Sequence, residues 1–231
     1  MTVGAVIFDF DDTLVHTNVF YDRLRQELFT EMDSLGLGRR EQWAEYLNQC
    51  DLDNIARAGR LIPDAFPRAM RQTGEHFAAL SGVELPPGAG KRFEDIGWSI
   101  YRMPVPLTDG AEELLQYLHG RLPLYLLTVG EPEYQGPRVE RSGVSRYFDE
   151  IRIVREKTPQ VFAELLRDKG LRPEEAWMVG NSIRSDVNPA LAAGLNVAYL
   201  KVAAWSYDVV EQTADCHTIT ELLELRELIG L

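Results

Sequence analysis

The chain has 231 residues, of which 45% are apolar and 26% are charged, and this composition predicts one or two folded domains with a packed core. Its 24 Lys and Arg residues against 36 Asp and Glu residues give a net charge of −12, which argues against a nucleic-acid partner, because phosphates need a basic surface. No apolar run approaches the ~18 residues of a transmembrane helix, so we expect no membrane association.

The chain opens with a short, nearly continuous apolar run, Val3–Phe10, and three acidic residues stand at its end: Asp9, Asp11 and Asp12. Such a run is typical of a strand that is buried on both faces of a parallel sheet. We therefore predict a first strand whose carboxyl end carries closely spaced carboxylates.

The next 90 residues lack the rhythm of strands. Apolar side chains recur at helical spacing, as at Phe20, Leu24 and Leu28, and several prolines punctuate the segment. These features predict an all-helical domain of residues 15–104, inserted after the first strand.

Strands and helices alternate through the rest of the chain. Short apolar runs predict strands, and stretches that begin near a proline or a capping residue and end near a glycine predict helices. The predicted strands are 122–128, 151–154, 176–179 and 197–200, and the predicted helices are 111–119, 133–141, 158–169 and 188–194. This alternation predicts an α/β domain with a doubly wound parallel sheet, formed by residues 1–14 and 105–231.

Two further features bear on the compartment. The N-terminal residues lack a basic start and soon reach Asp9 and Asp11, which is unlike a signal peptide. Cys50 and Cys216 have no metal-binding spacing and suit a reducing environment. We therefore expect a cytoplasmic protein.

Reactive side chains follow four of the predicted strands at their carboxyl ends, where open parallel sheets bind ligands. They are, in chain order, Asp9, Asp11, Thr128, Lys157, Asn181, Ser182 and Asp186. The pattern predicts one crevice that holds carboxylates, a hydroxyl, an ammonium group and an amide.

Carboxylates gathered in this way need a compensating charge. Two of them about 4 Å apart repel by roughly 4 kcal/mol at an effective dielectric constant near 20, so we expect a bound cation. Oxygen ligands in a site that also holds phosphate favour Mg²⁺, which polarises a phosphoryl group. A neighbouring carboxylate can then attack phosphorus and form an aspartyl-phosphate.

These segments resemble the motifs of the haloacid dehalogenase-like hydrolase superfamily and occur in that family's order. Asp9–Leu14 (Asp-Phe-Asp-Asp-Thr-Leu) is similar to the first motif and Leu126–Thr128 to the second. Lys157 stands at the position of the third motif, and Val179–Asp186 resembles the fourth. The helical insertion matches the cap that this family carries between its first and second motifs.

The resemblance implies a role for each matched residue. Asp9 would be the nucleophile and a metal ligand. Asp11 would protonate the leaving oxygen, later activate water, and lend its backbone carbonyl to the metal. Thr128 would bind the phosphoryl oxygens, Lys157 would offset negative charge on the nucleophile and the phosphate, and Asp186 would bind Mg²⁺.

The sequence departs from the family pattern at two places. Asn181 stands where an acid is common, and its amide oxygen can contact a metal-bound water without adding charge, so it remains a candidate metal-site residue. Val129 and Gly130 follow Thr128 where a polar residue is frequent, so contacts to phosphate beyond the hydroxyl are not expected there.

The leading hypothesis is a Mg²⁺-dependent phosphatase that acts on a small phosphorylated metabolite. Three alternatives stay open: a phosphomutase, a dehalogenase of the same superfamily, and a non-catalytic binding protein that keeps the fold. Asp11 argues against a dehalogenase, because a general acid suits an alkoxide leaving group better than a halide. The spacing of polar residues in the insertion, such as Tyr21, Arg57, Arg60 and Trp98, selects no substrate and no oligomeric state.

Overall fold

The computed structural model describes residues 3–202 and 210–231, which form two compact units. The first unit comprises Met1–Thr17 and Pro104–Leu231, and the second comprises Asn18–Met103. Residues 15–17 and 104 thus lie in the first unit, whereas the sequence assigned them to the helical insertion. The reason is backbone pairing: Val15 bridges to Leu107, and the His16 N–H donates to the Pro106 carbonyl at 2.9 Å.

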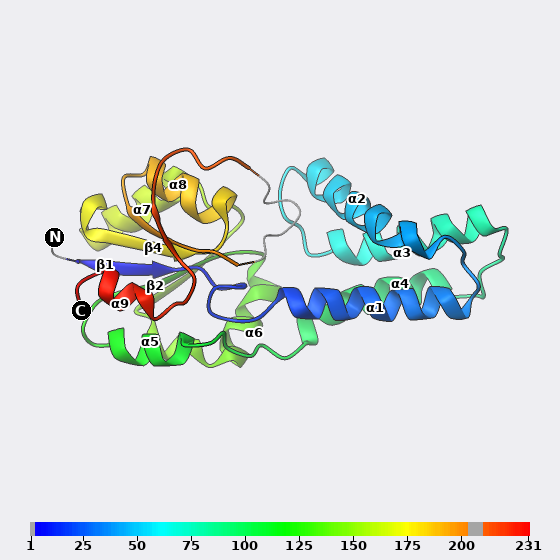
Figure 1. The fold of residues 1–231 in the computed structure, drawn as a ribbon, viewed down its shortest axis with the longest axis horizontal. Helices are drawn as coiled ribbons and strands as arrows, with labels where there is room; N and C mark the ends of the chain where they lie inside the picture. The colour runs from blue at the N-terminus through cyan, green and yellow to red at the C-terminus, as the bar shows by residue number, and fades with distance from the viewer. Residues whose placement is uncertain (1–2, 203–209) are drawn as a thin grey trace. The chain divides into compact units, whose positions relative to one another are not determined.

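The first unit is built on a parallel sheet, as predicted (Figure 1). Its described strands are β1 (Ala5–Phe8), β2 (Leu124–Val129), β3 (Glu150–Val154), β4 (Ala176–Gly180), β5 (Asn196–Leu200) and β6 (His217–Ile219). They lie in the order β3-β2-β1-β4-β5-β6, and each neighbouring pair is parallel. The first five strands correspond to the predicted ones, and β6 adds an edge strand that the sequence analysis did not predict.

Helices cover both faces of this sheet (Figure 1). One face carries α5 (Ala111–Leu118), α6 (Pro132–Ser142) and α9 (Glu224–Leu228), and the other carries α7 (Pro159–Lys169) and α8 (Asn188–Ala192). On β1, Val6 and Phe8 join the core beneath the first set, whereas Ala5 and Ile7 join the core beneath the second. Because both faces are buried, the strand reads as a continuous apolar run.

The strand order determines where a ligand site can form. The chain runs from β1 to β2 and β3 on one side of the sheet, then crosses to β4 and β5 on the other. A crevice at the carboxyl ends of the strands is expected where the direction reverses, beside β1. In register, Phe8 of β1 pairs with Leu126 of β2 and with Val179 of β4. The residues that follow these three therefore lie at one edge of the sheet.

The second unit is helical. It contains α1 (Asn18–Ser34), α2 (Arg40–Ala58), α3 (Ala65–Ser81) and α4 (Ala89–Trp98), which a 3₁₀ turn, Ser99–Arg102, continues. Its core holds large apolar side chains from each helix, including Leu28, Trp43, Phe77 and Phe93. α3 packs against both α2 and α4, and glycines at the α3–α4 contact allow these two helices to approach closely.

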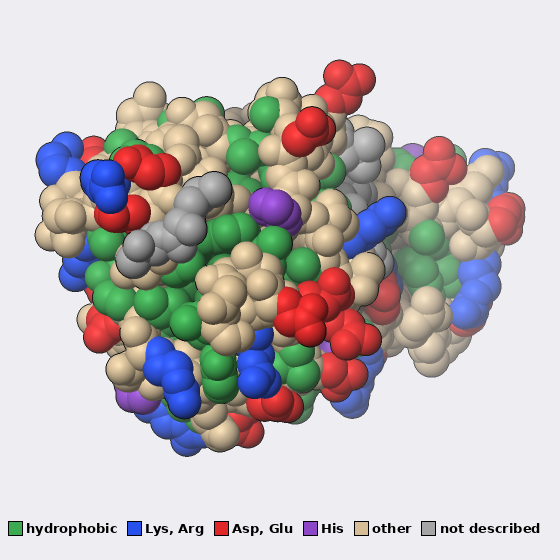
Figure 2. Space-filling model, turned by 60° about the vertical axis from the view of Figure 1, so that its left-hand side comes forward, with side chains coloured by type: hydrophobic (Ala, Val, Ile, Leu, Met, Phe, Trp, Pro, Cys, Tyr) green, Lys and Arg blue, Asp and Glu red, His purple; other side chains and the backbone are tan. Residues whose placement is uncertain are grey.

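On the face that Figure 2 shows, basic side chains are scattered among acidic and apolar ones. Across residues 3–202 and 210–231, no helix has both the length and the apolar character needed to cross a membrane.

Candidate active site

Asp9, Lys157 and Asp186 form a buried ionic cluster at the carboxyl edge of the sheet. Asp9 follows β1, Asp186 follows β4, and Lys157 lies between β3 and α7. The Lys157 Nζ lies 2.6 Å from Asp9 Oδ1 and 2.5 Å from Asp186 Oδ1. All three residues are buried, and Asp186 has no exposed surface. The single ammonium group offsets only one of the two carboxylates, so the trio carries a net negative charge when both carboxylates are ionised.

A π-helical turn, Ile183–Val187, brings Asp186 back beneath the end of β4. Such turns are rare in proteins, and those that occur often lie at functional sites. The Ser182 N–H donates to Asp186 Oδ2 at 3.0 Å, and Gly180 leaves room for that carboxylate. A Cβ at position 180 would lie only 2.3 Å from Asp186 Oδ2. The placement of Asp186 thus depends on the absence of a side chain at Gly180.

The pKa values follow from burial and from these contacts. Burial raises the pKa of Asp9 to about 7, the charge of Lys157 opposes this rise, and the charge of Asp186 adds to it. Burial alone would lower the pKa of Lys157, but the attraction of Asp186 and Asp9 raises it overall. Lys157 is therefore a firmly charged ammonium group, and ionised Asp9 is stabilised by any further cation nearby.

Thr13 connects the nucleophile candidate to Asn181. Its hydroxyl oxygen lies 3.0 Å from Asp9 Oδ2 and 3.1 Å from Asn181 Oδ1, and all three residues are buried. A carboxylate at position 181 would add a third negative group to the cluster at this point. The amide of Asn181 fills the same place without that repulsion. Thr13 has a structural function here that the sequence analysis did not assign.

Asp11 lies in a second, distinct network. Its Oδ1 contacts Arg138 Nη2 and accepts a hydrogen bond from Thr17 Oγ1, each at 2.6 Å, and its Oδ2 accepts one from Gln135 Nε2 at 2.6 Å. Burial raises the pKa of Asp11, but the charge of Arg138 and the hydrogen bonds outweigh it, so the pKa is lowered overall. Asp11 is therefore an ionised carboxylate in this arrangement.

The turn after β1 brings Thr17 to Asp11. Asp12 adopts a left-handed conformation with φ of 55°, and its Oδ1 accepts a hydrogen bond from the Thr17 N–H at 2.8 Å. Asp residues tolerate this conformation and favour such turns. Asp12 therefore shapes the loop and is not placed with the ionic cluster.

Thr128 lies one residue before the end of β2 and is almost fully buried. Its Oγ1 accepts a hydrogen bond from Gln135 Nε2 at 2.8 Å. Gln135 and Arg138 lie on α6, which the sequence predicts only as a polar helix. Their spacing of three residues, on a helix that begins directly after β2, is the signal that could have identified them, because it places both on one face near the carboxyl edge.

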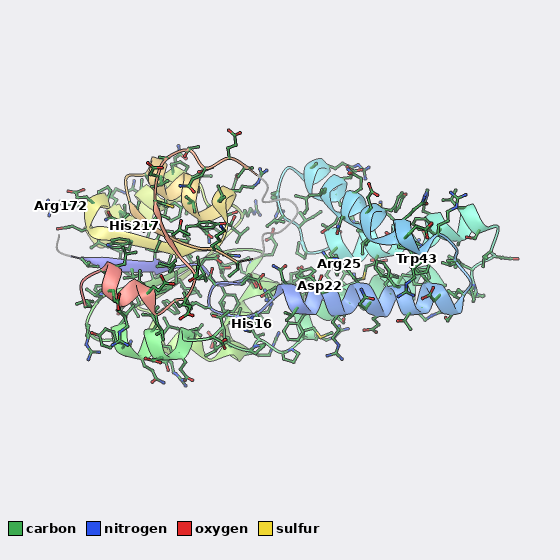
Figure 3. The ribbon with its side chains drawn as sticks, in the orientation of Figure 1. His16, Asp22, Arg25, Trp43, Arg172 and His217 are labelled. Atoms are coloured by element: carbon green, nitrogen blue, oxygen red, sulfur yellow. The ribbon has the colours of Figure 1, made fainter. Side chains whose placement is uncertain are left out.

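The donor set determines which metal could bind. Among the described residues, no group of three or more His, Cys, Asp or Glu side chains is arranged to hold a metal ion. Two carboxylates, those of Asp9 and Asp186, and the backbone carbonyl of Asp11 are the candidate ligands. Mg²⁺ takes oxygen donors and retains several waters, so this small set fits it. The exposed His16 and His217 lie far from each other (Figure 3) and offer no common site.

The polar residues proposed from the insertion lie within the helical unit. Tyr21 packs edge-on against Phe66 with ring centroids 4.7 Å apart, and Trp98 Nε1 donates to Glu94 at 3.4 Å. Arg57 is exposed and pairs with Asp53, one turn earlier on α2. These contacts all lie within the helical unit and do not identify a substrate.

Comparisons with known proteins agree with this architecture. The family model of haloacid dehalogenase-like hydrolases matches residues 3–194. The chain is 27% identical over 198 residues to the glyceraldehyde 3-phosphate phosphatase of Methanopyrus kandleri, covering 84% of this chain and 82% of that protein. It is 31% identical over 166 residues to the phosphoserine phosphatase of Thermus thermophilus, covering 68% of this chain and 61% of that protein. A haloacid dehalogenase-like hydrolase from Xanthomonas campestris has the same fold, with a TM-score of 0.78, 24% identity, and coverage of 99% of this chain and 93% of the other.

Proposed function

The chain belongs to the haloacid dehalogenase-like hydrolase family, and we propose that it is a Mg²⁺-dependent phosphatase that hydrolyses a small phosphorylated metabolite. Two relatives are named for phosphatase activity on different small substrates, glyceraldehyde 3-phosphate and phosphoserine. The names support the reaction type and leave the substrate of this chain open.

The free thiols of Cys50 and Cys216 support a cytoplasmic location.

The observation that carries the proposal is the buried Asp9 with the Lys157 ammonium group 2.6 Å away. An Asp9 carboxylate oxygen attacks phosphorus, the bond between phosphorus and the ester oxygen breaks, and that oxygen takes a proton from Asp11. Water then attacks phosphorus, its proton goes to Asp11, and the bond to Asp9 breaks. The products are an alcohol and inorganic phosphate, and both aspartates return to their starting states.

The network around Asp11 fits the second of these steps. Asp11 is ionised and held by Arg138, and an ionised carboxylate is the form that removes a proton from water. The first step needs the protonated form. A bound phosphate dianion raises the pKa of a neighbouring carboxyl group, because like charges disfavour ionisation. Substrate binding therefore favours the protonation state that the first step requires.

Several residues hold the phosphoryl group and its charge. Lys157 offsets the negative charge of the phosphate, and the Thr128 hydroxyl donates to a phosphoryl oxygen. Asp9, Asp186 and the Asp11 carbonyl would hold Mg²⁺, with Asn181 contacting a metal-bound water. The ion, when bound, neutralises the carboxylates and polarises the phosphoryl group.

Turnover of an aryl phosphate, measured with and without Mg²⁺ in the wild type and in Asp9→Asn, tests the proposal. We expect phosphate release only with the metal, and none in Asp9→Asn at an unchanged far-UV circular dichroism spectrum. Wild-type activity in that variant would refute the assignment of the nucleophile. Metal-independent halide release from a 2-haloacid would indicate a dehalogenase instead, and phosphoryl return to a second hydroxyl would indicate a phosphomutase. A screen of phosphorylated metabolites then identifies the substrate.

A further inference from the structure

Gln135 and Arg138 are deeply buried on a helix whose sequence is polar. Their exposed fractions are 4% and 8%. Gly130 lets the backbone pass close to Gln135, since a Cβ at position 130 would lie 3.1 Å from the Gln135 Cβ. Burying an amide and a guanidinium group costs free energy unless both are hydrogen-bonded. Their bonding partners therefore explain why these side chains are inside.

The donor and the acceptor in each hydrogen bond of Gln135 follow from the groups that its partners carry. Arg138 carries only donors, so the Gln135 atom 2.8 Å from its Nη1 must be the amide oxygen. The amide nitrogen of Gln135 then faces the opposite way, toward Asp11 Oδ2 at 2.6 Å and Thr128 Oγ1 at 2.8 Å. An amide nitrogen has two protons, one for each of these acceptors. Arg138 thus determines which end of the Gln135 amide reaches the site.

This direction determines what the Thr128 hydroxyl can do. Because Thr128 Oγ1 accepts a hydrogen bond from Gln135, its own proton must point elsewhere. Within the part of the chain that the structure describes, Gln135 is the only hydrogen-bonding partner of this hydroxyl. The proton remains available to an incoming group. With the opposite orientation of the amide, Thr128 would donate to Gln135 and could not donate to a phosphoryl oxygen.

We propose that Gln135 and Arg138 are positioning residues for phosphoryl transfer: Arg138 orients the Gln135 amide, and this amide directs the Thr128 hydroxyl proton to the phosphoryl group while holding the Asp11 carboxylate. The inference rests on the proposed phosphatase function. One nitrogen atom connects the phosphoryl-binding hydroxyl to the acid–base residue, and Arg138 also contacts Asp11 directly at 2.6 Å. The relative positions of Thr128 and Asp11 are therefore set from α6.

A double-mutant cycle between Gln135→Leu and Thr128→Val tests this coupling. The measured quantity is kcat/KM for 2,4-dinitrophenyl phosphate, whose leaving group departs without a proton, so that the contribution of Asp11 to the transfer step is small. Thr128→Val should lose about 10²-fold, the usual effect of removing one preorganised donor. Gln135→Leu should lose less, because the hydroxyl remains but is no longer oriented. In the Thr128→Val background, Gln135→Leu should change kcat/KM by no more than about twofold, because no hydroxyl is left to orient. Losses of the two single variants that multiply in the double variant would overturn the inference.

Gln135→Met separates positioning from packing. The Met side chain has a similar length and volume, but it donates no hydrogen bond to Thr128 or Asp11. We expect its kcat/KM to match that of Gln135→Leu although the space is filled. Wild-type kcat/KM in Gln135→Met would show that only packing matters and would overturn the inference.

A control comes from the exposed face of the same helix. Glu133→Leu changes an exposed side chain of α6 and should keep wild-type activity. A wild type that hydrolyses no phosphate would overturn the proposed function and this inference together. A wild type that does hydrolyse phosphate, combined with multiplying losses in the cycle, would overturn the inference alone.

Discussion

Asp186 shares the Lys157 ammonium group with Asp9 and is the most deeply buried carboxylate of the cluster. We predict that Asp186→Ala removes the stabilisation of the protein by Mg²⁺. A ligand that binds only the folded state at ten times its Kd adds about 1.4 kcal/mol to the free energy of unfolding. Thermal unfolding with and without Mg²⁺ measures this difference for each protein. Asp109→Ala, at an exposed acidic position, should keep the wild-type response, and an equal Mg²⁺ response in Asp186→Ala would remove this residue from the metal site.

Gly180 belongs to the same argument, because it makes room for the Asp186 carboxylate. An added Cβ would lie 2.3 Å from Asp186 Oδ2 and 2.7 Å from its Cβ, so the π-helical turn would have to shift. We predict that Gly180→Ala weakens Mg²⁺ binding at least tenfold and costs about 1–3 kcal/mol of stability, as overpacking does. Metal titration and urea unfolding measure the two effects. Gly38→Ala, where the nearest atom would be 3.6 Å away, should change neither; equal behaviour of the two variants would contradict the argument.

The sequence predicts one part of the site and misses another, for a physical reason. Side chains at or shortly after the carboxyl ends of apolar strands, such as Asp9, Thr128 and Asp186, are predictable because the carboxyl ends of parallel strands meet at one edge. Gln135 and Arg138 lie on a helix without an apolar stripe, and polar helical residues are usually solvated. Only the tertiary structure shows that this helix turns its amide and guanidinium groups inward.

At the scale of elements, the contact between α3 and α4 depends on small residues. A Cβ at Gly97 would lie 2.5 Å from the Cα of Pro67, and backbone atoms cannot move aside without separating the helices. We predict that Gly97→Ala lowers the free energy of unfolding by about 1–3 kcal/mol. Urea unfolding followed by far-UV circular dichroism measures this loss.

Gly90→Ala is the matched control on α4. There the atom nearest to the added Cβ would be Glu75 Oε1, at 2.6 Å, and this end of a flexible side chain can move. Alanine is also a better helix former than glycine by about 1 kcal/mol. The control should therefore be neutral or stabilising, and a loss as large as that of Gly97→Ala would show that close packing at Pro67 is not the cause.

Elements differ in how clearly the sequence marks them. The strands β1 to β5 contain apolar runs because the sheet is covered on both faces, and their predicted positions agree with the structure. The edge strand β6 is only three residues long and two of them are exposed, so no apolar run marks it. The π-helical turn after β4, Ile183–Val187, is too short to show a periodicity in the sequence. The helix predicted at 188–194 begins at Asn188, where that turn ends, and ends at Ala192.

For the whole molecule, the division into two units follows from a change of periodicity, from strands to helices and back. The boundary itself is set by backbone pairing. Residues 15–17 carry no periodic signal, yet they belong to the first unit, where Val15 bridges to Leu107 and Thr17 bonds to Asp11 and Asp12. The bridge between Val15 and Leu107 joins residues about 90 positions apart, so local patterns do not reveal it.

The stability of the whole molecule should also depend on pH through a carboxyl group far along the chain from the ionic cluster. Asp51 lies on α2, its Oδ1 is buried without a hydrogen-bond partner, and burial raises its pKa to about 6 despite the opposing charge of Arg25. Arg25 itself is paired with Asp22 on α1 at 2.7 Å (Figure 3). The folded state therefore binds more protons than the unfolded state between about pH 4 and pH 6, and the free energy of unfolding falls as the pH rises through this range.

We predict that Asp51→Asn stabilises the protein at neutral pH. A pKa raised from 3.8 to about 6 corresponds to a cost of up to about 3 kcal/mol once the group is ionised, and the neutral amide avoids this cost. Urea unfolding of the variant and the wild type at pH 7.5 and pH 4.5 measures the difference. The gain should be largest at pH 7.5 and should fall to about one third of that value at pH 4.5, where Asp51 is protonated in the folded wild type but still mostly ionised in the unfolded chain. A difference that is the same at both pH values would mean that packing, and not the buried charge, distinguishes the two side chains.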